Sequence, residues 1–250
     1  EIILIAQDTT AYGRDLGERD ALPGLLQDIA SAAPQVRWLR TLYAYPQHIS
    51  QELVDTMAAL PAACHYLDLP LQHGHPDVLR RMHRPHNLES VYRVIDMLRE
   101  AMPDIALRSS FIVGFPGETE QEFEGLLAFM REIAFDKVGV FAYSPEEGTP
   151  AVALPDHVPP QVIAERYEQA MLAQQEISLQ RNEAQVGREL EVLIEGVSEG
   201  LSVGRTYRDA PEIDGMVLIP GEAEVGSFAP TRIVAAQEYD LIGKFLTESE

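Results

Sequence analysis

Cysteine, positive charge and long apolar runs are all scarce in this sequence. The single cysteine, Cys64, excludes an internal disulfide. It also excludes a cysteine-ligated iron–sulfur cluster held by this chain alone, because such clusters usually need three or four thiolates. No stretch reaches the roughly 18 consecutive apolar residues of a membrane span. The N-terminus has no secretory signal pattern.

The shortage of basic residues is large: 19 Lys and Arg stand against 40 Asp and Glu, for a net charge of −21. Nucleic-acid-binding proteins normally present a basic face, so this balance disfavours direct nucleic-acid binding. It suits a cationic protein partner, which the acidic surface would attract electrostatically. Plain solubility is the alternative interpretation of the same charge.

The hydrophobic fraction of 46% in 250 residues predicts a folded protein of one or two domains. Over the first three-fifths of the chain, apolar runs typical of strands alternate with amphipathic segments typical of helices. The predicted strands are 2–6, 37–43, 65–69, 105–113 and 137–143. The predicted helices are 22–32, 50–59, 76–82, 88–101 and 119–134, with Ser50, Asn87 and a Thr119–Glu122 capping box at three N-termini.

Strands separated by single helices predict right-handed βαβ units, a parallel sheet and an α/β barrel or part of one. In such barrels, ligands bind at the carboxyl ends of the strands. The fold class predicted for this part is therefore a partial (βα) barrel.

The pattern changes at the proline-rich segment 155–160. A long helix over 161–186 follows, with Val162, Ile163, Tyr167, Met171 and Ile177 on its apolar side. Short strand-like runs then predict a small all-β barrel, at 189–195, 202–207, 215–219, 223–226 and 231–235. The domain prediction is thus a barrel core over 1–155, a connecting helix over 156–186 and a β-barrel over 187–250.

Polar residues follow several predicted strands at the edge where a barrel has its site. These segments are 7–10 (QDTT), 70–73 (PLQH), 108–110 (RSS) with 114–118 (GFPGE), and 141–146 (FAYSPE). Each one alone could be turn chemistry or a satisfied core pair. Together they favour binding over acid–base or nucleophilic catalysis, because no nucleophile elbow, phosphate-binding loop or metal-spaced histidine pair occurs. The set suits a zwitterionic, nucleoside-bearing ligand without identifying it.

The segment 111–119 (FIVGFPGET) resembles the glycine-containing strand-five motif of radical S-adenosylmethionine (SAM) enzymes, in the form found in methylthiotransferases. Further segments are similar to the same family, in family order: 7–13 (QDTTAYG), 66–73 (YLDLPLQH), 82–84 (MHR) and 143–149 (YSPEEGT). The resemblance implies a radical-SAM barrel followed by a TRAM domain, a small OB-like barrel.

The resemblance also implies S-adenosyl-L-methionine and two [4Fe–4S] clusters as cofactors. The SAM-binding residues that it implies are Gln7, Gln72, Arg108, Ser110, Val113, Gly114 and Phe141. Among these, Arg108 is expected to face the ligand carboxylate, and Val113 or Phe141 the adenine. No catalytic or metal-ligating side chain is predicted in this chain. The family's cluster cysteines lie in regions expected upstream of Glu1, so we expect this polypeptide alone to be inactive.

Two branches of the family differ in substrate: one modifies an adenosine of tRNA, the other an aspartate of a small-subunit ribosomal protein. Segment 204–215 (GRTYRDAPEIDG) resembles the ribosomal-protein branch. Residues 187–250 carry 5 Lys and Arg against 13 Asp and Glu, a net of −8 that suits a basic ribosomal protein as partner. The alternatives are a tRNA adenosine methylthiotransferase and an acidic protein-binding module without catalysis. The implied location is the cytoplasm.

Overall fold

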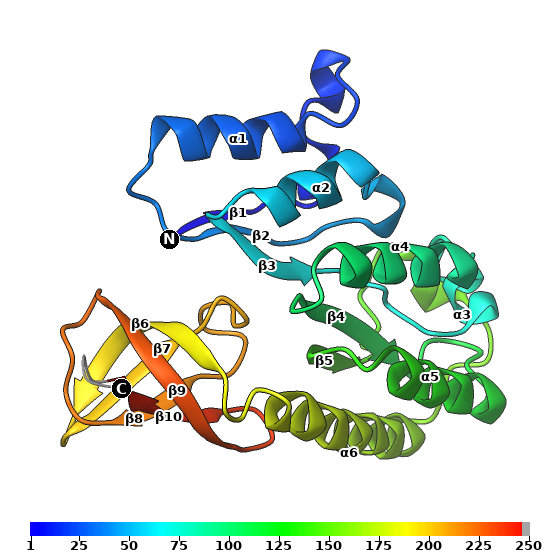
Figure 1. Cartoon of the computed structure of the whole chain (residues 1–250). Helices are drawn as coiled ribbons and strands as arrows, with labels where there is room; N and C mark the ends of the chain where they lie inside the picture. The colour runs from blue at the N-terminus through cyan, green and yellow to red at the C-terminus, as the bar shows by residue number, and fades with distance from the viewer. Residues whose placement is uncertain (247–250) are drawn as a thin grey trace. The chain divides into compact units, whose positions relative to one another are not determined.

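The structure, a computed structural model, describes residues 1–246 and divides into two compact units between Gln174 and Gln175 (Figure 1). The first unit contains a parallel sheet with helices, and the second contains a closed β-barrel. The predicted fold class is confirmed in both parts. No helix in the described part of the chain combines the length and the apolar character needed to cross a membrane.

Five parallel strands form the sheet of the first unit, in the order in which they occur along the chain. They are β1 (Ile2–Leu4), β2 (Leu39–Thr41), β3 (Ala63–Asp68), β4 (Ala106–Val113) and β5 (Lys137–Ala142). The connecting helices are α1 (Leu22–Ala32), α2 (Gln51–Ala59), α3 (Pro76–Arg81), α4 (Leu88–Ala101) and α5 (Glu120–Ile133). Short 3-10 turns lie at Thr9–Ala11, Arg14–Leu16, Pro46–His48 and Pro150–Ala153. Every predicted strand and helix of this unit is present, with ends that differ by up to two residues.

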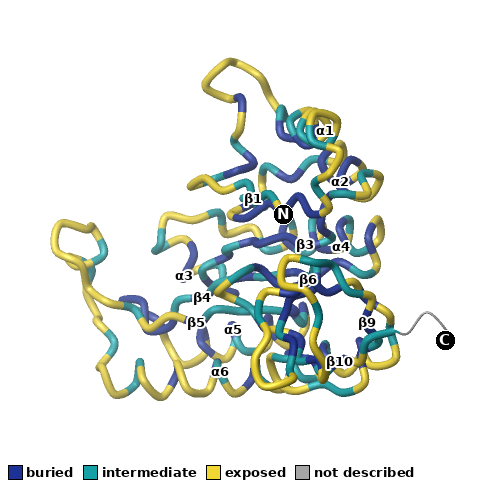
Figure 2. Tube along the Cα trace, turned by 90° about the vertical axis from the view of Figure 1, so that its left-hand side faces the viewer, coloured by how far each residue is buried: buried dark blue, intermediate teal, exposed yellow. Residues whose placement is uncertain are grey.

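The core of this unit lies between the sheet and its helices, and Figure 2 shows the buried residues running along β3 and β4. Tyr66, Phe111, Phe123 and Phe135 are among its largest fully buried side chains. The rings of Phe111 and Phe135 meet edge to face with centroids 6.0 Å apart, the arrangement that aromatic quadrupoles favour. The core therefore fixes β4, which carries three of the predicted ligand residues: Arg108, Ser110 and Val113.

Side-chain caps begin three of the helices as the sequence predicts. Ser50 and Asn87 accept hydrogen bonds from backbone N–H groups at the starts of α2 and α4. Thr119 and Glu122 form the full capping box of α5. These caps satisfy backbone donors that a helix leaves unpaired, so the helix starts are set by local sequence.

Helix α6 (Pro160–Glu183) crosses the boundary between the two units. Its predicted apolar side is wrong in part, because Tyr167 is exposed while Arg166, Ala170 and Ala173 are buried. Arg166 is buried because it pairs with Glu118, and the alanines are small enough for close packing. The periodicity of apolar residues could not predict the buried face of α6, because that face includes an arginine.

The second unit is a closed barrel with the strand order β10-β8-β7-β6-β9. Its strands are β6 (Glu189–Ser198), β7 (Leu201–Arg205), β8 (Val217–Pro220), β9 (Phe228–Ala236) and β10 (Leu241–Phe245). Val192, Ile194, Val217, Ile219 and Ile233 form the centre of its core. Alternation of buried and exposed residues along β6 places Val192 and Ile194 on its inner face.

One predicted strand of this barrel is wrong and another was missed. Residues 223–226 form a loop and turn instead of a strand, with Gly226 in the left-handed region and Ser227 hydrogen-bonded to the Glu224 carbonyl. The last strand is β10, whose Gly243 lies so close to Thr231 that an added Cβ would come within 2.4 Å of it. A glycine required by barrel packing weakens the strand pattern that the sequence would otherwise show.

Candidate functional site

A cavity of about 300 Å³ lies at the carboxyl ends of the strands in the first unit. It is lined by Gln7, Tyr43, Ala44, Tyr45, Pro70, Gln72, Arg84, Arg108, Ser110 and Phe141. Five of the seven residues predicted to bind a ligand are in this set: Gln7, Gln72, Arg108, Ser110 and Phe141. They come from β4, from β5 and from the segments that follow β1 and β3, so the sheet brings together residues far apart in sequence.

Strand β4 forms hydrogen bonds with both the backbone N–H and the backbone carbonyl of Gln72. Its backbone N–H donates to the Ser110 carbonyl at 2.8 Å, and its own carbonyl accepts from the Ile112 N–H at 2.8 Å. These bonds keep Gln72 at φ 71°, in the left-handed region that non-glycine residues rarely adopt. Such strain persists only where surrounding structure enforces it, and it concentrates at binding sites.

Arg108 and Phe141 form a polar and an apolar wall of the cavity. The Nη1 atom of Arg108 donates to Oδ1 of the buried Asp68 at 2.9 Å, which fixes the direction of the guanidinium. Phe141 is 55% exposed, and its ring lies close to Gly139, where an added Cβ would come within 3.2 Å of it. A guanidinium suits a carboxylate, and an exposed ring suits a flat aromatic group.

Val113 and Gly114 are the two predicted residues that do not line the cavity. Both are buried, and the Val113 carbonyl accepts from the Tyr143 N–H at 2.9 Å. The Gly114 N–H donates to Oε2 of Glu118 at 3.0 Å. Their backbone groups are thus used within the fold, and their contact with a ligand stays a prediction.

Three residues that line the cavity were not predicted from the sequence: Tyr43, Tyr45 and Arg84. The two tyrosines follow β2, whose carboxyl end carried no recognised motif, and Tyr43 lies at φ 55°. Arg84 belongs to the 82–84 segment, which resembled the family without a role attached to it. An aromatic-rich loop after a strand was the available signal for the tyrosines.

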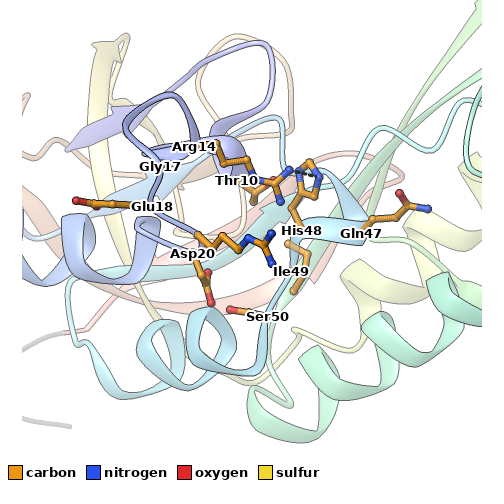
Figure 3. A pocket seen from close by; sticks show the side chains of 10 residues that line it. Thr10, Arg14, Gly17, Glu18, Asp20, Gln47, His48, Ile49 and Ser50 are labelled. Carbon is orange, nitrogen blue, oxygen red and sulfur yellow. Dashed lines mark hydrogen bonds between the residues drawn. The ribbon is translucent and has the colours of Figure 1, made fainter.

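A second and larger cavity, of about 700 Å³, opens beside the loops after β1 and β2. It is lined by Thr10, Arg14, Gly17, Glu18, Arg19, Asp20, Gln47, His48, Ile49 and Ser50 (Figure 3). Figure 3 shows Arg14 reaching from the loop after β1 to the imidazole of His48. The rings of Tyr45, which lines the first cavity, and His48, which lines the second, lie with centroids 5.0 Å apart, so the two cavities are neighbours.

The buried titratable groups of this unit do not form a catalytic set. Burial lowers the pKa of His73, and the neighbouring Glu118 only partly opposes that shift. His73 is fully buried, and its Nδ1 already accepts from the His75 N–H. Cys64 is buried within β3. Cys64 lines neither of the two cavities described above, and His73 lines only a small third cavity of about 30 Å³.

His75, Asp77 and Glu122 lie close enough together to hold a metal ion. Glu122, however, accepts hydrogen bonds from Arg81 with both oxygens, at 3.0 and 2.8 Å. Burial alone would raise the pKa of Glu122, but the bonds from Arg81 and the Thr119 backbone outweigh it and lower the pKa to about 2. The carboxylate is therefore an ion-pair partner of Arg81, and a cation would have to displace that arginine.

In the second unit, the segment that resembles the ribosomal-protein branch forms a loop bonded to itself and to β6. The guanidinium of Arg205 donates to Glu195 and to the Asp209 carbonyl. Thr206 donates to Asp209, and the Ala210 N–H donates to Asp214. These hydrogen bonds hold the loop in shape.

Two family models match this chain. The radical SAM superfamily matches residues 16–130, and the TRAM domain matches residues 186–246. The fold of coproporphyrinogen III oxidase (HemN) from Escherichia coli, a radical SAM enzyme, is similar with a TM-score of 0.50. At 16% identity over 62% of this chain and 37% of that chain, this likeness shows the fold alone. The class is thus a radical SAM domain followed by a TRAM domain.

Curated relatives define the group within that class. The chain is 54% identical over 251 residues to ribosomal protein uS12 methylthiotransferase RimO of Roseiflexus sp. strain RS-1, covering 98% of this chain and 53% of that protein. It is 52% identical over 252 residues to the protein of the same name from Chloroflexus aurantiacus, covering 99% and 55%. The chain belongs to the radical SAM methylthiotransferase family. It spans about half the length of the curated relatives that it matches.

Proposed function

We propose that this chain is the SAM-binding and TRAM portion of an enzyme that methylthiolates an aspartate of a small-subunit ribosomal protein. The observation that carries the proposal is the cavity at the carboxyl edge of the sheet, which gathers five residues implied by family motifs. We also propose the domain layout of 1–155, 156–186 and 187–250. The cytoplasm is the proposed location, because the ribosomal substrate is found there.

The residues around this cavity fit S-adenosylmethionine. Its volume of about 300 Å³ is at the lower end of the range for small-molecule sites. When bound, the cofactor supplies the hydrogen-abstracting radical and a methyl group. Arg108 would hold its carboxylate while Asp68 orients the guanidinium, and Gln7, Gln72 and Ser110 offer partners for hydroxyl or amine groups. Phe141 offers a ring face for the adenine.

The residues do not fit the two [4Fe–4S] clusters that the family uses. Each such cluster needs several thiolates, and this chain has one cysteine, which is buried in β3. We therefore propose that the chain by itself is inactive, and that cluster ligands come from protein outside this sequence.

The substrate assignment rests on the charge of the second unit and on the relatives. A net charge of −8 over residues 187–250 suits a basic polypeptide and repels a phosphate backbone. The curated relatives are named for ribosomal protein uS12. A tRNA adenosine substrate is the second candidate within the family. An acidic docking module without chemistry is the candidate of another class.

The test joins this chain to the part of the Roseiflexus relative that it does not cover. After reconstitution with iron and sulfide, the chimera and the chain alone are incubated with SAM, a reductant and either isolated ribosomal protein uS12 or tRNA. We expect the mass gain of one methylthio group on the ribosomal protein with the chimera, and none with the chain alone. Transfer to tRNA without transfer to the protein would select the second candidate. If the chimera carries its clusters and modifies neither the ribosomal protein nor tRNA, the result would support the docking module without chemistry.

A further inference from the structure

The larger cavity lies beside the proposed SAM cavity and has no part in the function proposed so far. Its walls come from the loops that follow β1 and β2, at the same edge of the sheet. Tyr45 lines the smaller cavity and packs against His48 of the larger one. The larger cavity therefore neighbours the proposed SAM cavity, and a polypeptide that reaches the cofactor would pass close to it.

A chain of hydrogen bonds orients Arg14 in this cavity. Nη1 of Arg14 lies 2.7 Å from Nε2 of His48, and Nδ1 of His48 lies 2.8 Å from Oδ2 of Asp8. A guanidinium has donors and no acceptor, so Nε2 must accept and the ring proton must sit on Nδ1. Asp8 is held in turn by the Thr10 hydroxyl at 2.5 Å. This array positions Arg14 without placing a carboxylate against it.

The charges of the cavity are not paired with one another. Among the residues that the structure describes, neither Arg14 nor Arg19 forms an ion pair with Glu18, Asp20 or any other carboxylate. Two guanidiniums on the wall of one cavity offer bidentate partners for a carboxylate, and the two unpaired acids offer partners for a basic neighbour.

We infer that this cavity binds a carboxylate side chain of the polypeptide substrate, with Arg14 as the oriented contact and Arg19 as the second cation. Glu18 and Asp20 then face basic residues that flank the carboxylate. The inference rests on the proposed function, since it assigns to this cavity an acidic side chain in a basic polypeptide. A polyanionic ligand is disfavoured because the same walls carry two carboxylates.

The test measures binding of two short blocked peptides by calorimetry at low salt. Both are lysine-rich, and they differ only in a central aspartate or asparagine. We expect the wild-type chain to bind the aspartate peptide about fivefold tighter, the effect of one exposed ion pair. The Arg14→Gln/Arg19→Gln double variant is expected to bind both peptides equally. Both arginines are exposed, so the variant should fold.

Arg93→Gln is the matched control, because Arg93 is an exposed arginine on α4 far from this cavity in sequence. It is expected to keep the preference for aspartate. The inference is overturned if the wild type binds both peptides equally, or if the double variant keeps the preference for aspartate. Neither result contradicts the proposal that the partner is a basic polypeptide. Binding of neither peptide also overturns the inference, whereas the proposed function is judged separately by the methylthio mass gain.

Discussion

Replacing Arg166 should lower the free energy of unfolding of the first unit more than replacing any exposed arginine. Arg166 donates to the Glu118 carboxylate at 2.8 Å and to the Glu118 carbonyl at 2.9 Å. The side chain of Glu118 is fully buried, and its other oxygen accepts from the Gly114 N–H at 3.0 Å. One ion pair therefore joins α6 to the turn after β4.

The magnitude follows from what Arg166→Met leaves behind. Methionine keeps an apolar stem beside Phe123, over whose ring the guanidinium now lies at 5.4 Å. The Glu118 carboxylate, in contrast, loses its cation inside the protein, and breaking a buried pair in this way costs about 3–5 kcal/mol. Adding Glu118→Gln to Arg166→Met removes the stranded charge, so the double variant should recover part of that loss.

The assay is urea unfolding followed by tryptophan fluorescence. Trp38 is the only tryptophan in the sequence and is buried in the first unit, so its emission reports on that unit. The matched control is Arg93→Met, which removes an arginine with a 75% exposed side chain and should cost less than about 0.5 kcal/mol. A loss below about 1 kcal/mol for Arg166→Met would refute the view that this pair braces the turn.

Three further predictions concern close packing and acid stability. Gly114→Ala should cost about 2–4 kcal/mol, because φ is +77° and the new Cβ would come within 2.4 Å of an α6 side chain. Gly148→Ala, at φ +85° with nothing within 4 Å, should cost only about 1–2 kcal/mol in the same fluorescence assay. The pKa of Glu122 in the folded state is lowered from 4.5 to about 2. Its pairing with Arg81 therefore stabilises the fold above pH 4.5, and this contribution is lost as the pH falls toward about 2. Urea titrations across that range should show a loss of about 1–3 kcal/mol that is absent in Glu122→Gln. Gly204→Ala should destabilise the barrel of the second unit by about 1–3 kcal/mol, because the new Cβ would come within 2.2 Å of a backbone carbonyl of β6. The destabilisation should be measurable as faster amide hydrogen exchange in β6 and β7.

The fold was predictable where local sequence and burial act in the same direction. The capping box of α5 and the apolar strand β4 each carry their signal within about fifteen residues. Prediction failed where distant packing decides the outcome. The apolar side of α6 was misassigned because Arg166 is buried by its pairing with Glu118, 48 positions earlier. Strand β10 was not predicted because it contains Gly243, a residue that weakens the strand pattern and that close packing against Thr231 requires.

The candidate site was predictable to the extent that parallel strands end at one edge. That rule sufficed to gather Gln7, Gln72 and Arg108 around a cavity. It could not predict that the Asp68 carboxylate orients Arg108, since the two residues lie on neighbouring strands 40 positions apart. The pairing of Arg14 with His48 was equally inaccessible, because it depends on how two loops approach each other.

Backbone strain gives an independent reason to regard this edge as a binding surface. Asp20, Tyr43 and Gln72 all have positive φ, and each lines one of the two neighbouring cavities. A left-handed non-glycine residue costs about 1–3 kcal/mol unless its surroundings enforce it. For Gln72 the enforcement is visible, since β4 bonds both its N–H and its carbonyl. The backbone of Gln72, and with it the direction of its Cα–Cβ bond, is therefore set by the sheet before any ligand arrives, which lowers the entropy that binding must overcome.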